Sequence, residues 1–155
     1  MARPPDVAAA VGRGLVAGAA GTALMTVATT VEMKLRGRAP SAVPADAATK
    51  VLGVEPTGER EKERFSNLVH WAYGTAWGSL RGLLAAAGLP GPAAATVHFA
   101  AVWGGGLVLL PRLEVAPPVR QWGPSAVALD AAHHLVYACG ASLAYAALAP
   151  ERRRR

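Results

Sequence analysis

Four long segments of this sequence carry almost no charged residues, and each is about as long as a membrane span. The segments cover about 8–31, 65–89, 93–110 and 125–149. At a helical rise of 1.5 Å per residue, roughly 20 residues cross the ~30 Å hydrocarbon core of a bilayer. None of the segments has the wide polar face that a helix of a soluble bundle needs. We therefore predict an all-α integral membrane protein, an up-down-up-down four-helix bundle, with a soluble four-helix bundle as the alternative.

The chain of 155 residues is long enough for one domain, and we treat 1–155 as a single membrane domain. Its net charge of +6 comes mostly from Lys and Arg residues that lie between and beyond the apolar segments. Basic residues in such places attract anionic lipid headgroups. The expected partners are therefore the lipid bilayer and either another copy of this chain or another membrane protein, and nucleic acid is not expected.

The connections between the segments predict how the helices alternate. The short link at 88–92, with the sequence GLPGP, makes the second and third helices antiparallel neighbours. The loop 33–64 contains a stretch at about 44–52 that should form a short surface helix, with Pro44 in its first turn and Gly53 at its end. Both termini then lie on one side of the membrane, side A, and the long loop lies on the opposite side, side B.

Small residues recur at four-residue spacing in three of the segments. This spacing places them on one helix face, where the absence of a bulky side chain lets two membrane helices approach closely. The glycines that we expect to pack helices together are Gly14, Gly18, Gly74, Gly78, Gly82 and Gly140.

Polar residues at membrane depth are the candidates for a functional site, because ionisable groups in a bilayer normally face the interior of a helix bundle. Periodicity and estimated depth place one polar cluster, a possible ligand site, near side B. Its expected members are Glu32, His70, Tyr73, Asp130, His133, His134 and Tyr137. A second polar layer, nearer side A, is expected from Arg81 and His98.

Three interpretations of the side B cluster are open. The groups can pair with one another and hold the helices together in a structural or interaction subunit, they can bind or conduct a proton, an ion or a small molecule, or they can serve a metal- or cofactor-dependent membrane enzyme. The sequence contains no nucleophile elbow, P-loop, HExxH motif or Rossmann fingerprint. We therefore favour the structural role and expect no enzymatic activity, catalytic residue, metal or cofactor.

Four stretches also carry a resemblance to known proteins. GLVAGAAGTALMT, RGRAPSAVPA, LVHWAYGTAWGSLRGLL and DAAHHLVYACGASLAY resemble small four-span bacterial membrane proteins of unknown function, loosely grouped with YagU-like inner-membrane proteins. The resemblance covers about 12–148. It implies a multi-pass protein of the bacterial inner membrane with no established activity or cofactor. The second and fourth segments also resemble each other, which suggests two related helix hairpins.

Overall fold

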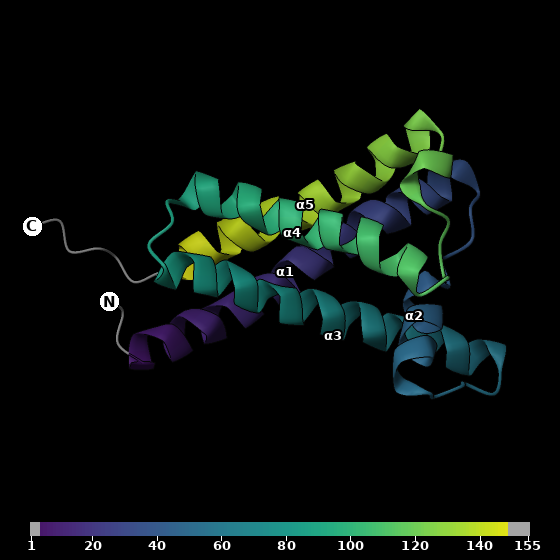
Figure 1. Cartoon of the computed structure of the whole chain (residues 1–155), viewed down its shortest axis with the longest axis horizontal. Helices are drawn as coiled ribbons and strands as arrows, with labels where there is room; N and C mark the ends of the chain where they lie inside the picture. The colour runs from purple at the N-terminus through teal and green to yellow at the C-terminus, as the bar shows by residue number, and fades with distance from the viewer. Residues whose placement is uncertain (1–3, 149–155) are drawn as a thin grey trace, which may run out of the picture.

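The computed structural model describes residues 4–148, and every regular element in that part of the chain is helical. The prediction of an all-α chain is confirmed. The helices, shown in Figure 1, are α1 (Pro4–Arg36), α2 (Val43–Leu52), α3 (Glu59–Ala86), α4 (Gly91–Arg112) and α5 (Pro124–Leu148), with the 3₁₀ turn η1 (Val119–Gln121) before α5.

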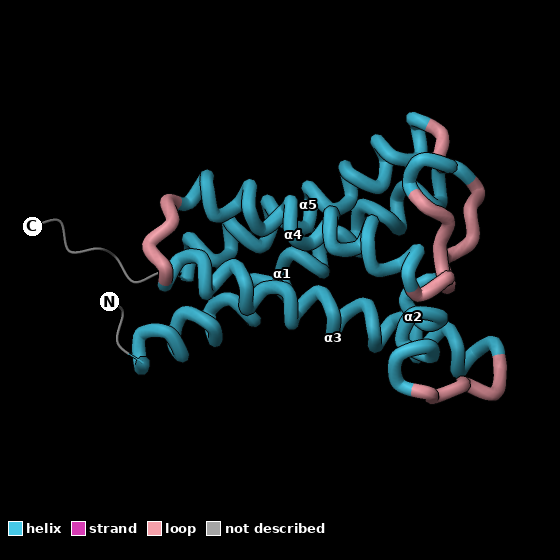
Figure 2. The backbone as a smooth tube through the Cα atoms, in the orientation of Figure 1, coloured by secondary structure: helices cyan, strands magenta, loops and turns pink. Residues whose placement is uncertain are grey.

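The four long helices alternate in direction along the molecule. α1 begins and α5 ends at one end, and α2 lies at the opposite end (Figure 1). Figure 2 shows that the loops gather at these two ends, with the link between α3 and α4 at the end where α1 begins. These ends correspond to side A and side B, so the order of the long helices is up, down, up, down.

The boundaries of two elements follow from local chemistry. α2 has Pro44 in its first turn, and Gly53 ends it with a left-handed φ of 67°, donating its N–H to the carbonyl oxygen of Thr49 at 2.9 Å. α3 begins at Glu59, six residues before the expected start of the apolar segment at 65, because the charged run GEREKER continues the helix into solvent. α1 and α4 extend a few residues beyond both expected ends, whereas α3 ends at Ala86, three residues before the expected 89, and α5 covers Pro124–Leu148.

α1 is the helix around which the others are arranged. It packs along both α3 and α5, whereas α4 packs against α5 and α3, and α2 lies against α3. The contact between α1 and α3 is made through backbone atoms. A Cβ added at Gly18 would lie 2.7 Å from the carbonyl oxygen of Thr75 and 2.8 Å from the Cα atom of Gly78. A Cβ would also collide with the facing helix at Gly14, Gly74, Gly78 and Gly82.

A second close contact joins α1 to α5. A Cβ added at Gly21 would lie 2.6 Å from the carbonyl oxygen of Tyr137, and one added at Gly140 would lie 2.6 Å from Cδ1 of Leu24. Gly21 was not among the expected packing glycines, because those were chosen by four-residue spacing and Gly21 lies three residues after Gly18. α1 therefore presents small residues on two faces, one for each neighbour.

The burial of side chains is the reverse of that in a water-soluble domain. The largest fully buried side chains are His98 and Thr22, and most of the buried apolar residues are alanines. Large apolar side chains are exposed on every long helix, among them Val27 (62%), Leu68 (65%), Val108 (50%) and Leu143 (71%). Small and polar residues thus occupy most of the interior, beside a small apolar cluster of Val102, Tyr137 and Ala138, and many large aliphatic residues lie on the outer surface.

Two of the helices are long and apolar enough to cross a membrane by hydropathy. They are Asp6–Arg36 in α1, with a mean hydropathy of 1.5, and α4, with 1.7. α3 and α5 do not meet the same criterion, since α3 contains Arg81 and α5 contains Asp130 and two histidines. Hydropathy therefore supports two of the four expected membrane spans.

Candidate polar site inside the helix bundle

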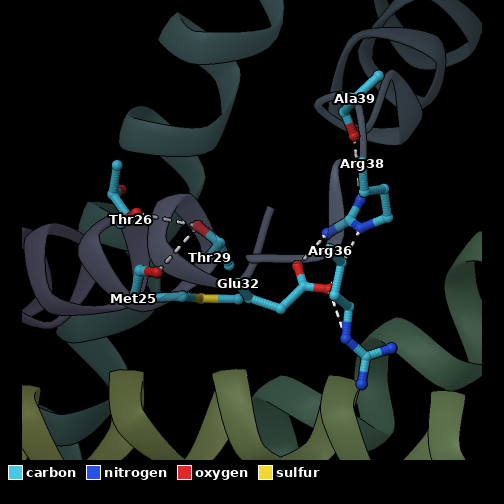
Figure 3. A network of polar contacts seen from close by, with 7 residues as sticks. All are labelled: Met25, Thr26, Thr29, Glu32, Arg36, Arg38 and Ala39. Atoms are coloured by element: carbon cyan, nitrogen blue, oxygen red, sulfur yellow. Dashed lines mark hydrogen bonds and ion pairs between the residues drawn. The ribbon is translucent and has the colours of Figure 1, made fainter. Parts of the chain in front are cut away.

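Glu32 lies at the side B end of α1, where it pairs with arginines. Its carboxylate accepts a hydrogen bond from Arg38 at 2.7 Å and lies 3.5 Å from Nε of Arg36. Figure 3 shows both guanidinium groups reaching the same carboxylate, with the hydroxyl of Thr29 bonded further along the helix. Glu32 is 9% exposed, and its charge is compensated by these basic residues at the helix end. It makes no hydrogen bond to the expected histidine and aspartate cluster within residues 4–148.

His70 reaches from α3 to α1. Its Nε2 atom lies 3.2 Å from the hydroxyl oxygen of Thr26. The single proton of that hydroxyl is donated to the carbonyl oxygen of Thr22 at 2.8 Å. When the hydroxyl proton points to Thr22, Nε2 of His70 completes the contact by donating its own proton to the Thr26 oxygen. The bond connects α3 to Thr26 of α1.

Asp130 on α5 has its partner on α4. The indole N–H of Trp103 donates to Oδ2 of Asp130 at 2.9 Å, and His134 places Nδ1 3.7 Å from the same oxygen and 2.8 Å from the Asp130 carbonyl oxygen. His133, half-buried, makes no hydrogen bond in the described part of the chain. Sequence reasoning missed Trp103, although an indole N–H that is shielded from water requires an acceptor and so indicates one nearby.

Of the two tyrosines expected in the cluster, Tyr137 is buried and Tyr73 is exposed. Tyr137 is 2% exposed, and its hydroxyl donates to the carbonyl oxygen of Gly74 at 2.6 Å. Tyr73 is 46% exposed and packs edge to face against Trp77, with 6.0 Å between ring centroids. The expectation that Tyr73 joins the buried cluster is wrong, because the rotation of α3 against α1 turns the Tyr73 side of α3 outward.

The hydrogen bonds and ion pairs of the expected side B residues fall into smaller groups. Glu32 pairs with two arginines, His70 with Thr26, and Asp130 with Trp103 and His134. His70 lies on α3 and His134 on α5, and these two helices contact each other. Within residues 4–148, no group of three or more histidine, cysteine, aspartate or glutamate side chains has the arrangement of a metal site.

The second polar layer lies inside the bundle nearer side A. His98 is fully buried; its Nε2 atom lies 3.1 Å from the carbonyl oxygen of Trp77, and its ring lies 5.5 Å from that of Tyr137. Arg81 is 4% exposed and donates from Nε to the hydroxyl of Ser142 at 3.2 Å. The sequence analysis did not include Ser142, nor the aromatic ring of Tyr145 that lies beside Arg81.

Comparison with known proteins gives no relative from which a function could be inferred. No family model, no curated protein and no solved structure matches this chain.

Proposed function

We propose that this chain is an integral membrane protein that crosses the bilayer four times and acts as a structural or interaction subunit of a bacterial inner membrane. The observation that carries the proposal is the reversed burial. A soluble bundle would bury its leucines and valines, whereas here they form the outer surface and the interior holds His98, Thr22 and alanines. Only 28% of the apolar stretch of α1 and 17% of that of α4 is buried, whereas the core helices of a soluble protein are mostly buried.

Polar residues inside the bundle on α3 and α5, such as Arg81 and Tyr137, are compatible with membrane spans, because they lower the mean hydropathy of a helix without facing outward. The hydroxyl of Tyr137 and the guanidinium of Arg81 join these two helices to each other. The outward surfaces of the same helices carry large aliphatic residues, including Leu68 on α3 and Leu135 on α5. Lipid would therefore contact an apolar surface along both helices.

A structural role is supported by the way the side B groups are satisfied. His70, Asp130 and Tyr137 each bond to a neighbouring helix, and each of these bonds crosses an interface between two long helices. Interhelical hydrogen bonds of this kind stabilise membrane bundles. The resulting outer surface, with α4 packed mainly on α5 and α3, is available to lipid or to another membrane protein.

The experiment introduces one charge into the outer surface of α5. Leu135 is 50% exposed near the middle of the helix. In a bilayer, arginine at this depth costs about 2.5–3.5 kcal/mol, so Leu135→Arg should reduce the fraction of protein that stays in membranes after carbonate extraction. In a soluble bundle, the same exposed substitution would be tolerated.

Leu35→Arg is the matched control. Leu35 is 82% exposed, but it lies at the side B end of α1 between Lys34 and Arg36, where a charge meets headgroups and water. We expect this variant to behave like the wild type. Release of the wild-type protein by carbonate, or equal membrane fractions for the two variants, would overturn the proposal.

A further inference from the structure

Two arginines from different helices converge on one aromatic ring near side A. The guanidinium carbon of Arg81, on α3, lies 4.6 Å from the centroid of the Tyr145 ring, and that of Arg13, on α1, lies 6.0 Å from it. Tyr145 is itself 6% exposed, on α5. Three helices thus meet at this ring, and two positively charged groups lie against it.

Neither arginine is fully paired. Nη1 of Arg81 and Nε of Arg13 are buried and have no hydrogen-bond partner, and Nδ1 of the nearby His98 is also unpartnered. Among residues 4–148, no carboxylate forms a salt bridge with either guanidinium. An arginine stays charged in a protein, and a buried charge without a counter-charge is strongly unfavourable. The face of a tyrosine offsets only part of that cost.

The depth of the pair indicates where a counter-charge would come from. Arg81 lies five residues before the end of α3, which is about 8 Å along the helix from side A. Arg13 is partly exposed, so the pair is connected to the surface of the molecule. In a bilayer, long basic side chains near the end of a helix reach the level of the headgroups, so a headgroup phosphate is within reach of the pair.

We propose that Arg13 and Arg81 bind a phosphate group, supplied either by a lipid headgroup or by free phosphate. A guanidinium presents its donors as a planar fork that matches phosphate oxygens, and the two guanidinium groups reach the same Tyr145 ring from different helices. The free Nη1 of Arg81 and the free Nε of Arg13 are the donors that the phosphate would accept from. The lipid source rests on the proposed membrane placement, whereas the anion site itself does not.

The test uses the full-length protein, purified in detergent and stripped of lipid, and measures its thermal transition. Inorganic phosphate should raise the transition temperature above that in chloride of equal ionic strength if the free anion is the ligand. Phosphatidylglycerol added to the micelles, but not diacylglycerol with the same acyl chains, should raise it if the ligand is a headgroup. Either result supports the site and identifies its source.

Variants connect the effect to the two arginines. Arg13→Gln and Arg81→Gln should each weaken the stabilising ligand's apparent affinity at least tenfold, whereas Arg112→Gln, an exposed arginine at the side B end of α4, should not change it. Arg13→Lys keeps the charge without the fork and should also weaken binding. If Arg81→Gln does not fold, the Arg13 variants decide, because Arg13 makes no hydrogen bond to another helix in the described chain.

The proposal is overturned if neither phosphate nor phosphatidylglycerol raises the transition of the wild type, or if Arg112→Gln weakens the effect as much as Arg13→Gln. The phosphate measurement is made in detergent. A soluble protein with the same two arginines would give the same phosphate result, so this measurement does not depend on the membrane proposal. The membrane proposal is tested separately by carbonate extraction, and the failure of one proposal can therefore be told from the failure of the other.

Discussion

Tyr137 is the residue at which all four long helices meet. It belongs to α5, its hydroxyl bonds to Gly74 of α3, and its backbone carbonyl lies against Gly21 of α1. Its ring lies 5.5 Å from that of His98 on α4. A tyrosine suits this position because the ring fills apolar space while the hydroxyl reaches a polar partner.

Tyr137→Phe should therefore destabilise the bundle. The change keeps the ring but removes a buried hydrogen bond, for which we expect a loss of about 1 kcal/mol in the free energy of unfolding. Tyr73→Phe is the control, since the exposed Tyr73 hydroxyl makes no hydrogen bond within residues 4–148. Thermal or chemical unfolding in detergent would measure both, and an equal effect of the two substitutions would contradict the role assigned to Tyr137.

At the scale of elements, the bundle depends on the glycine contact between α1 and α3. A Cβ at Gly78 would collide with the backbone of Gly14 and Gly18, whereas one at Gly12 would meet nothing within 4 Å. Both glycines are inside helices, so the alanine substitution has the same intrinsic propensity in each case. Only the interhelical contact differs.

The two substitutions should consequently have opposite signs. Gly78→Ala should lower the free energy of unfolding by about 1–3 kcal/mol, because the helices must move apart. Gly12→Ala should be neutral or raise it by up to about 1 kcal/mol through better helix propensity. Unfolding of the two variants side by side measures this difference. Destabilisation of similar size in both would mean that the α1–α3 contact is not made at Gly78.

Local signals in the sequence predicted the ends of some helices well. Which side chains contact each other across two helices was harder to predict. Pro44 and Gly53 fix the ends of α2 through chemistry that neighbouring residues supply. The facing side of α3 followed from the spacing of its glycines. The bond from Trp103 to Asp130, the outward position of Tyr73 and the use of Gly21 depend on how the helices are rotated against one another. That rotation is a property of the packed bundle and has no local signal.

The basic residues at the two ends of the molecule predict which end faces the cytoplasm. Side B carries nine Lys or Arg residues and side A carries six, when Arg81 inside the bundle is not counted. Cytoplasmic loops of membrane proteins are enriched in Lys and Arg, so we expect side B to be cytoplasmic and side A to face outward.

Cysteine labelling of intact cells checks this orientation. In a Cys139→Ala background, a cysteine added at the C-terminus should react with a membrane-impermeant maleimide. Glu55→Cys, in the exposed side B loop, should react only after the cells are permeabilised. The opposite pattern would show that the molecule is inserted the other way round.

The central position of α1 has a consequence for the order in which the protein is made. α1 is synthesised first, yet its two neighbours are α3, which begins at Glu59, and α5, which begins only at Pro124. Until the last quarter of the chain has left the ribosome, Gly21 and the rest of the α5-facing side of α1 have no neighbour from α5. Assembly can therefore be completed only after synthesis of the final helix, and a chain that ended before Pro124 would lack the residue that joins all four long helices.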